Sequence, residues 1–252
     1  VLQPISWQSP ADVLEKIIQY EAVHEITSWE DLRSRLEPED RRCFAFFHPS
    51  MPNEPLIFVE VALTYGVPNS IQSVLSYKRA KDDHVQANTA VFYSISNCQS
   101  GLAGISFGNS LIKQVVEDLS YELTNLKTFV TLSPIPTFKK WLEETGRKTI
   151  GYASNDISKL AAHYLLNGKH DNGFPYDSVA RFHLGNGALV HAIHENADIS
   201  KKGELQSLGA MVNYLYDLSL IPSNHEKFAS EKKIAASIEV TSLNKAAIKE
   251  KL

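Results

Sequence analysis

The chain has 252 residues, of which 43% are hydrophobic and 21% charged, the balance of an ordinary globular protein that can bury a sizeable core. Its 25 lysines and arginines stand against 29 aspartates and glutamates, a net charge of -4, so no basic excess indicates a nucleic-acid partner. No apolar run reaches the roughly 18 residues that a membrane-spanning helix needs, and we expect no membrane partner.

The two cysteines, Cys43 and Cys98, are isolated and lack metal-ligand spacing, which indicates a reduced intracellular compartment. We expect a cytoplasmic protein, with mitochondrial and peroxisomal locations left open. The first residue is Val1 and not methionine, so we expect further residues ahead of it in the complete protein.

Residues 1–40 are expected to form a helical lead-in. Ser9 and Pro10 predict a helix start, with the serine as cap and the proline at the first helical position. Apolar residues at helical spacing continue this helix to about Tyr20. Ser28 predicts the start of a second helix.

The hydrophobic period then changes to that of strands. Residues 43–47 and 56–63 predict two strands joined by a turn, which together indicate an antiparallel hairpin. Residues 66–88 are polar and irregular, and we expect a short helix and a surface loop there. Residues 89–96 predict a third strand.

A loop of small residues follows this strand, with Gly101, Gly104 and Gly108, and opens onto a helix expected from about Ser110 to Leu123. Glycines let the backbone approach a ligand, and a helix start presents unpaired N–H groups, so the loop suits a phosphate or pyrophosphate. The spacing is neither that of a Walker loop nor that of a dinucleotide fingerprint, and an ordinary tight loop stays open as the alternative.

The next apolar run, residues 129–132, predicts a strand that ends at Ser133. Strand, helix and strand at this spacing predict a parallel pair with a right-handed crossover, and open parallel sheets bind ligands at the carboxyl ends of their strands. Pro134 biases Ser133 away from helical geometry. The alternative is a structural turn serine. No Gly-x-Ser-x-Gly elbow surrounds it, so a hydrolase nucleophile is the least favoured interpretation.

Later elements follow the same logic. Residues 138–146 and 155–166 predict helices, and the tail beyond Glu226 predicts a weakly amphipathic helix. Residues 184–187 contain Asn-Gly, which predicts a hairpin turn between two strands. This interpretation places His183 at a strand end.

Nine histidines compete for a catalytic role. His191 and His194 are three residues apart on an expected strand, and without a His-Glu-x-x-His motif two structural histidines are favoured over a zinc site. His24 is favoured as a packing or capping residue. No periodicity argument selects His183 from the others.

Several segments, in order along residues 9–220, resemble the catalytic region of malonyl-CoA decarboxylases. They include EAVHEITSWEDL, FYSISNCQSGLAGISFGNS, TLSPIPTFKKWL, FHLGNGA and GAMVNYLYDL. The resemblance implies a mixed α/β chain with a GNAT-type acyl-CoA-binding fold, in which splayed parallel strands are surrounded by peripheral helices. It also implies that residues 41–252 form the catalytic domain, with a C-terminal helical tail.

The resemblance assigns the catalytic pair to Ser133 and His183. The family's coenzyme A loop matches seven consecutive residues of this chain: Ala103, Gly104, Ile105, Ser106, Phe107, Gly108 and Asn109. No metal and no cofactor are expected, because the thioester of the substrate is itself the electron sink.

The implied reaction converts malonyl-CoA into acetyl-CoA and carbon dioxide, in malonate and fatty-acid metabolism. Ser133 is expected to engage the departing carboxylate or to relay a proton. His183 is expected to protonate the α-carbon, with an ordinary pKa near 6.5. The alternatives are a GNAT-type acyltransferase that moves an acyl group from coenzyme A to an amine, and a non-catalytic acyl-CoA sensor.

The resemblance carries two departures. Family members usually have a helical domain ahead of the catalytic one that serves subunit assembly, so we expect a homo-oligomer in the full-length form. The segment between Ser133 and His183 is also shorter than the family leads us to expect.

Overall fold

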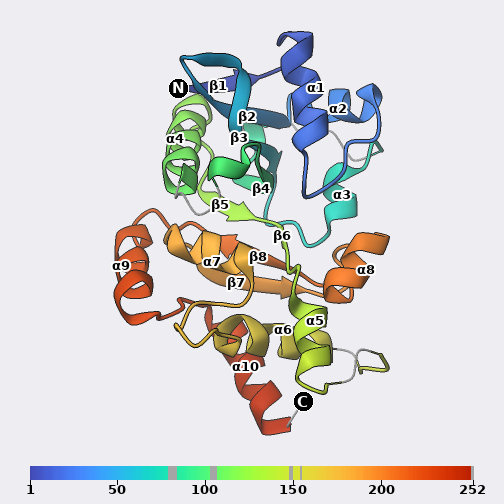
Figure 1. Cartoon of the computed structure of the whole chain (residues 1–252), viewed down its shortest axis with the longest axis vertical. Helices are drawn as coiled ribbons and strands as arrows, with labels where there is room; N and C mark the ends of the chain where they lie inside the picture. Colours follow the sequence, from blue (N-terminus) through green and yellow to red (C-terminus); the bar gives the residue numbers. More distant parts are fainter. Residues whose placement is uncertain (79–83, 103–106, 148–149, 154, 251–252) are drawn as a thin grey trace. The chain divides into compact units, whose positions relative to one another are not determined.

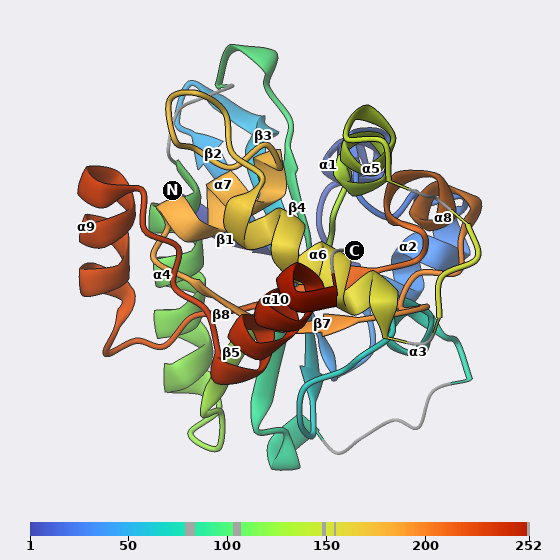
Figure 2. The same ribbon diagram turned by 90° about the horizontal axis from the view of Figure 1, so that it is seen from below.

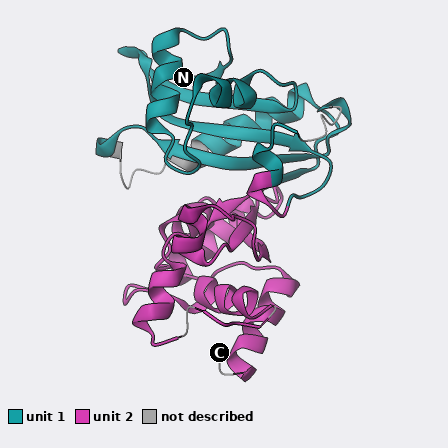
Figure 3. Ribbon diagram, turned by 90° about the vertical axis from the view of Figure 1, so that its right-hand side faces the viewer, with its two compact units in different colours: residues 1–68, 73–129 teal, residues 69–72, 130–252 magenta. Residues whose placement is uncertain are grey.

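The computed structural model describes residues 1–78, 84–102, 107–147, 150–153 and 155–250. The chain forms two compact units (Figure 3), of which the first comprises residues 1–68 and 73–129 and the second residues 69–72 and 130–252. The expected lead-in of residues 1–40 and domain of residues 41–252 stay predictions. Within the described residues, no helix is long and apolar enough to cross a membrane.

Antiparallel strands form the sheet of the first unit (Figure 1). Their order across the sheet is β1 (Leu2–Ile5), β2 (Arg41–His48), β3 (Met51–Thr64) and β4 (Thr89–Asn97). The hairpin predicted over residues 43–63 is confirmed, and so is the third strand. The alternation of side chains along β2 places Cys43, Ala45 and Phe47 on one face, where all three are buried in a common core.

Two helices contribute most of the other residues of that core, α1 (Ala11–Tyr20) and α2 (Trp29–Leu36). Ser28 caps α2 by accepting a hydrogen bond from the Asp31 N–H, as predicted. The predicted cap of α1 is wrong: Pro10 occupies the cap position, and the Ser9 hydroxyl instead accepts from the Ser6 N–H.

The remaining elements before residue 130 are short, apart from one helix. They are α3 (Ile71–Leu75), two 3-10 turns (His84–Gln86 and Ser100–Leu102), α4 (Phe107–Glu122) and β5 (Thr128–Thr131). The short helix predicted between residues 66 and 88 and the long helix after the glycine loop are both confirmed, although α4 begins at Phe107 and not at Ser110. The parallel pairing of the strands on either side of α4 stays a prediction.

One strand organises the sheet of the second unit. This strand, β8 (Met211–Leu215), pairs antiparallel with β5, with the two-residue strand β6 (Ser133–Pro134) and with β7 (Leu189–His194). This strand was not among those expected from the sequence. Its five residues are nearly all buried, so its position between partners is a property of the fold and not of a visible alternation.

Helices surround these strands (Figure 1). They are α5 (Phe138–Glu144), α6 (Asp156–Asn167), α7 (Ser178–Gly185), α8 (Lys201–Ser207), α9 (Ile221–Glu231) and α10 (Ile238–Glu250). The helices predicted for residues 138–146 and 155–166 are confirmed. The tail is two helices and not one, because Lys232 takes a left-handed conformation with φ of 55° and ends α9. Figure 2 shows α10 lying along α6.

The hairpin predicted around residues 184–187 is wrong, because His183 lies on α7. Asn186 is the C-cap of that helix and Gly187 follows with φ of 84°. A left-handed glycine after a C-cap is a common helix ending, so here the Asn-Gly pair ends a helix where a hairpin turn was expected. A Cβ at Gly187 would lie 2.5 Å from the Ile221 carbonyl oxygen, which leaves room for glycine alone.

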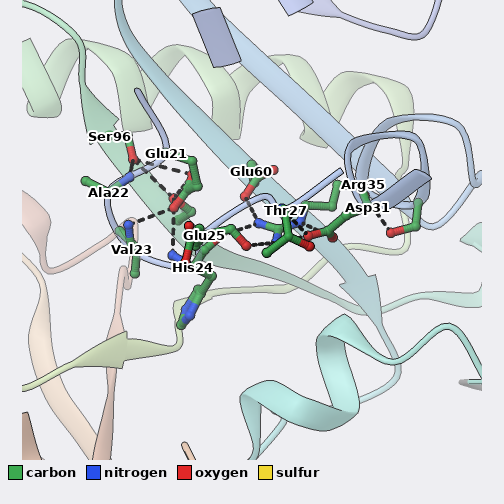
Figure 4. A network of polar contacts seen from close by, with 12 residues as sticks. Glu21, Ala22, Val23, His24, Glu25, Thr27, Asp31, Arg35, Glu60 and Ser96 are labelled. Atoms are coloured by element: carbon green, nitrogen blue, oxygen red, sulfur yellow. Dashed lines mark hydrogen bonds and ion pairs between the residues drawn. The ribbon is translucent and has the colours of Figure 1, made fainter. Parts of the chain in front are cut away.

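Buried charges link α2 to β3 in the first unit (Figure 4). Arg35 is 3% exposed, and its guanidinium lies 3.1 Å from the Asp31 carboxylate and 3.3 Å from Glu60 Oε2. Glu60 is completely buried, and its Oε1 has no hydrogen-bond partner among the residues that the structure describes. Burial, together with the charge of Glu21, raises the pKa of Glu60 to about 8, although Arg35 opposes the shift.

This raised pKa makes stability depend on pH. An unfolded glutamate titrates near pH 4.3 and the folded Glu60 at about 8, so between these values the folded chain binds more protons and its stability falls as pH rises. Between pH 6 and pH 8, we expect the free energy of unfolding of Glu60→Gln to fall by about 1 to 2 kcal/mol less than that of the wild type. Urea unfolding at the two pH values measures both changes. The control is Glu117→Gln, at an exposed site on α4. Equal pH dependence of Glu60→Gln and wild type would contradict the buried, protonated Glu60.

Candidate active site

Ser133 lies in the short strand β6, where it pairs with Val212 of β8. Its side chain is buried, with 5% of the residue exposed. Pro134 follows with a fixed φ and no N–H to donate; it pairs with Met211 and is the last residue of the strand. The predicted strand is present but ends earlier, at Thr131, and Ser133 begins a separate two-residue strand that also pairs with β8.

His183 lies in the last turn of α7 and is 4% exposed. Asp177 caps this helix by accepting a hydrogen bond from the Ala180 N–H at 2.9 Å. Ala180, His183 and Leu184 are the buried residues of the helix, and their spacing of three and four residues places them on one face. The imidazole is therefore held inward by the helix that carries it.

The structure brings the two sequence-predicted residues together. Ser133 Oγ lies 3.3 Å from His183 Nε2, and the serine hydroxyl donates its hydrogen to Thr131 Oγ1 at 2.8 Å. Because a hydroxyl has one hydrogen, the contact with the imidazole requires Nε2 to carry the proton and donate it to the serine oxygen. A serine nucleophile needs the opposite arrangement, with the imidazole accepting from the hydroxyl.

The other ring nitrogen of His183 is also engaged. The Tyr216 hydroxyl lies 2.7 Å from Nδ1, and with the proton on Nε2 this hydroxyl donates to the bare Nδ1. Tyr214 lies two residues earlier, at the end of β8, and stacks on the imidazole with centroids 4.7 Å apart at 23°. The two tyrosines fix the position of His183, one by a hydrogen bond and one by its ring face.

Burial lowers the pKa of His183 to about 3. The imidazole is consequently neutral throughout the physiological range, and the expectation of an ordinary pKa near 6.5 is wrong for the folded chain. Burial also raises the pKa of Tyr216 well above its ordinary value. The line of hydroxyls and imidazole from Tyr216 to Thr131 therefore carries no charge near neutral pH.

Sequence reasoning missed Thr131, Tyr214 and Tyr216. Thr131 could have been found, because residues two apart in an extended chain point to the same side and Thr131 precedes Ser133 by two. Its Oγ1 accepts from both Ser133 and the Tyr214 N–H. The tyrosines alternate in the same way, but nothing in the sequence placed their strand beside Ser133.

The other candidate residues lie elsewhere or outside the described part of the chain. Of the expected coenzyme A loop, residues 103–106 lie outside the described residues, and Phe107, Gly108 and Asn109 are the first residues of α4. His194 Nε2 bonds to Asn213 Oδ1, a structural contact. No group of three or more metal-ligating side chains occurs among the residues that the structure describes.

Comparison with known families places this geometry in context. The chain matches the family model described as malonyl-CoA decarboxylase C-terminal domain, over residues 1–156 and 148–252. The chain belongs to this family. Curated relatives named mitochondrial malonyl-CoA decarboxylase are 37% identical in Anser anser anser and 36% identical in Rattus norvegicus, each over 96% of this chain. The resemblance of the quoted segments is thereby confirmed.

Solved structures agree with this membership. Malonyl-CoA decarboxylase from Rhodopseudomonas palustris is 49% identical with a TM-score of 0.88, covering 95% of this chain and 65% of its own. The enzyme from Agrobacterium vitis is 48% identical with a TM-score of 0.90, covering 96% and 66%. The GNAT-like decarboxylase GphF, 16% identical over 86% of this chain and 98% of its own, shares the fold with a TM-score of 0.58. The predicted mixed α/β chain of GNAT type is confirmed.

The chain spans 57% and 58% of these curated relatives. The alignments with them run over 288 and 289 positions, more than the 252 residues of this chain. The relatives therefore carry residues without counterparts here, and the two matches to the family model meet between residues 148 and 156. That place lies between Ser133 and His183, in the segment that was expected to be short.

The neutral state of His183 gives a measurable pH dependence of stability. Unfolding returns the imidazole to a pKa near 6.5, so between about pH 3 and 6.5 the unfolded chain binds more protons and stability falls as pH falls. We expect this loss in the wild type, about 1.4 kcal/mol per pH unit well below 6.5, to be absent from His183→Gln in urea unfolding at pH 7, 6 and 5.

The matched control for this experiment is His48→Gln, since His48 is exposed and its loss also removes one imidazole. The control is expected to keep the wild-type pH dependence. A His183→Gln variant whose stability falls with pH as steeply as that of the control would show that His183 is charged in the folded chain.

Proposed function

We propose that this chain releases carbon dioxide from malonyl-CoA and forms acetyl-CoA. The observation that carries the proposal is the hydrogen-bonded line Tyr216–His183–Ser133, buried and neutral, in a chain of the malonyl-CoA decarboxylase family. Because the chain spans little more than half of its curated relatives, the activity of the whole protein is part of the proposal.

The chemistry asks for three things from the protein. The bond between the carboxylate carbon and the α-carbon breaks, and its electron pair moves into the thioester carbonyl as an enolate. The carboxylate leaves as neutral carbon dioxide, so the negative charge passes to the enolate. One proton then adds to the α-carbon and completes acetyl-CoA. The protein must orient the carboxylate, tolerate the enolate charge and supply that proton.

The geometry supports a neutral proton donor. The α-carbon of a thioester enolate is a far stronger base than an imidazole nitrogen, so an imidazolium is not needed to protonate it. Ser133 gives its hydroxyl proton to the carbon, the His183 Nε2–H restores it, and Tyr216 returns a proton to Nδ1. Once the product leaves, solvent supplies a proton at Nε2 and Nδ1 returns its proton to Tyr216, which restores the starting tautomer. The transfers from Tyr216 to His183 and from His183 to Ser133 follow hydrogen bonds of 2.7 and 3.3 Å.

We propose further that residues 103–109 bind the pyrophosphate of coenzyme A, on the glycine pattern and the family resemblance. The reaction uses no metal and no cofactor in this proposal, since the thioester accepts the electrons. The curated relatives are named mitochondrial, a location that the prediction left open. The cytoplasmic location, homo-oligomeric assembly and role in fatty-acid metabolism stay predictions.

The first test is incubation of the purified chain with malonyl-CoA and no amine acceptor, with detection of carbon dioxide and acetyl-CoA. We expect both products from the wild type. In His183→Ala and Ser133→Ala, we expect kcat to fall by about 10²- to 10⁴-fold with little change in KM, because the proton is used only in the transition state. An acyltransferase would release no carbon dioxide here, and a sensor would bind malonyl-CoA unchanged.

The second test is the pH dependence of kcat. Because the folded His183 has a pKa of about 3, its protonation state does not change between pH 5.5 and 8. We therefore expect kcat to lack a break near pH 6.5 in the wild type. A tenfold fall in kcat per pH unit above 6.5, absent from His183→Gln, would mean that the imidazolium is the acid and that the neutral relay is wrong.

A further inference from the structure

Asp177 is buried beside the catalytic helix without belonging to the hydrogen-bonded line. It is 1% exposed and stands directly before α7, where its Oδ1 accepts from the Ala180 N–H. Its second oxygen, Oδ2, accepts from Thr137 Oγ1 at 3.2 Å. Burial raises the pKa of Asp177, while hydrogen bonds from Ala180, Thr137 and Val179 oppose the shift. The carboxylate therefore binds Thr137 in addition to capping α7.

Thr137 belongs to the segment that carries the serine. It lies four residues after Ser133, and Pro134 and Pro136 between them have fixed φ angles. The Thr137 hydroxyl also lies 2.6 Å from the Tyr164 hydroxyl. A carboxylate only accepts hydrogen bonds, so Thr137 donates to Asp177, and Tyr164 donates to Thr137. Both the hydrogen and the lone pairs of Thr137 are therefore used.

The two segments consequently form a closed frame with two crosslinks. Ser133 meets His183 at one end, and Thr137 meets Asp177 at the other. One arm is a stretch with two prolines and the other is the first turns of a helix, so both arms are stiff. Residues 138–176 connect Thr137 to Asp177 and are not part of the frame.

The match to the family model is divided within the segment outside the frame. The two matches to the family model meet between residues 148 and 156, and the alignments with the curated relatives are longer than this chain. A change in length between residues 138 and 176 does not alter the number of residues in either arm of the frame. The contact between Thr137 and Asp177 thus separates the variable segment from the catalytic pair.

We propose that Asp177 is a positioning residue: by holding Thr137, it sets the separation of Ser133 and His183 and makes that separation independent of the segment 138–176. The inference rests on the proposed decarboxylation for its kinetic readout. We call the contact between Thr137 and Asp177 the clamp. Displacement of a catalytic group by about 1 Å costs up to roughly 100-fold in rate, so the clamp governs turnover without touching the substrate.

The experiment compares variants that release the clamp in different ways. Thr137→Val removes the hydroxyl, keeps the hydrogen bond from the Thr137 backbone N–H to Asp177 and leaves the cap of α7 intact, whereas Asp177→Ala removes all of these contacts. Asp177→Asn keeps an oxygen for the Ala180 N–H and an amide that can bond to Thr137. We expect kcat to fall roughly 10- to 100-fold in Thr137→Val and Asp177→Ala with KM within about twofold, and Asp177→Asn to recover most of the activity.

The matched control is Ser200→Ala. Ser200 caps α8 by accepting from the Gly203 N–H at 3.1 Å, so its loss removes one helix cap while leaving every hydrogen bond of the catalytic line and of the contact between Thr137 and Asp177 in place. We expect its melting temperature to fall as in Asp177→Ala while its kcat stays at the wild-type value. Kinetic losses in the clamp variants no larger than in Ser200→Ala would overturn the proposal.

A second comparison tests whether the separation of Ser133 and His183 is independent of the length of the segment 138–176. A short Gly-Ser insertion after the exposed Gly151 is expected to leave kcat unchanged in the wild type and to lower it further in Thr137→Val. An insertion that lowers kcat equally in both backgrounds would contradict the role of the clamp.

A readout without turnover separates this inference from the proposed function. Nitrogen NMR of the His183 imidazole reports which ring nitrogen carries the proton and how uniquely it is held. We expect one tautomer, with Nε2 protonated, in the wild type and in Ser200→Ala, and averaged signals in Thr137→Val. If the wild type releases no carbon dioxide, the proposed function is wrong, but the NMR measurement still tests the clamp. Unchanged His183 signals in Thr137→Val would show that the clamp does not position the imidazole.

Discussion

A neutral imidazole, buried and hydrogen-bonded at both ring nitrogens, is the constraint on which the second unit depends. An ionised group in this place would lose its hydration without gaining an opposite charge, at a cost of several kcal/mol. Every partner on the line is accordingly an uncharged hydroxyl, from Tyr216 through Ser133 to Thr131. The Ser133 hydroxyl has one hydrogen and donates it to Thr131. His183 must therefore donate to Ser133, so its proton is on Nε2.

The strand β8 makes this line possible. It pairs with β5, β6 and β7, so the segments that carry Thr131 and Ser133 lie beside the segment that carries the tyrosines. The Tyr214 N–H bonds to Thr131 Oγ1 while its ring stacks on His183. Backbone pairing and side-chain contacts therefore hold the same residues, and a preorganised set of uncharged dipoles can respond to charge that develops in a reaction without first being reoriented.

The first unit solves the burial of polar groups differently. Arg35 lies between Asp31 and the fully buried Glu60, and Glu21 receives hydrogen bonds from Ser94 and from the Val23 and His24 N–H groups (Figure 4). There the buried Arg35 is paired with acidic side chains, and Glu60 takes up a proton because burial raises its pKa to about 8. In the second unit, Asp177 is the buried carboxyl nearest to the catalytic line in sequence, and it is satisfied by hydrogen bonds from Thr137 and Ala180. The catalytic line itself therefore contains hydroxyls and an imidazole but no carboxyl.

The sequence by itself determined the strands and helices with a clear period, such as Cys43 to Phe47 and the apolar face of α1, because a side chain's face follows directly from local geometry. It also named Ser133 and His183, through family motifs and not through physics. Only the tertiary structure decided that His183 lies on a helix, because Asn-Gly ends a helix or turns a hairpin according to what surrounds it. The same holds for the pKa of His183 and for its contacts with Tyr214 and Tyr216. Both depend on burial and on strand pairing between residues far apart in the chain, which no local pattern encodes.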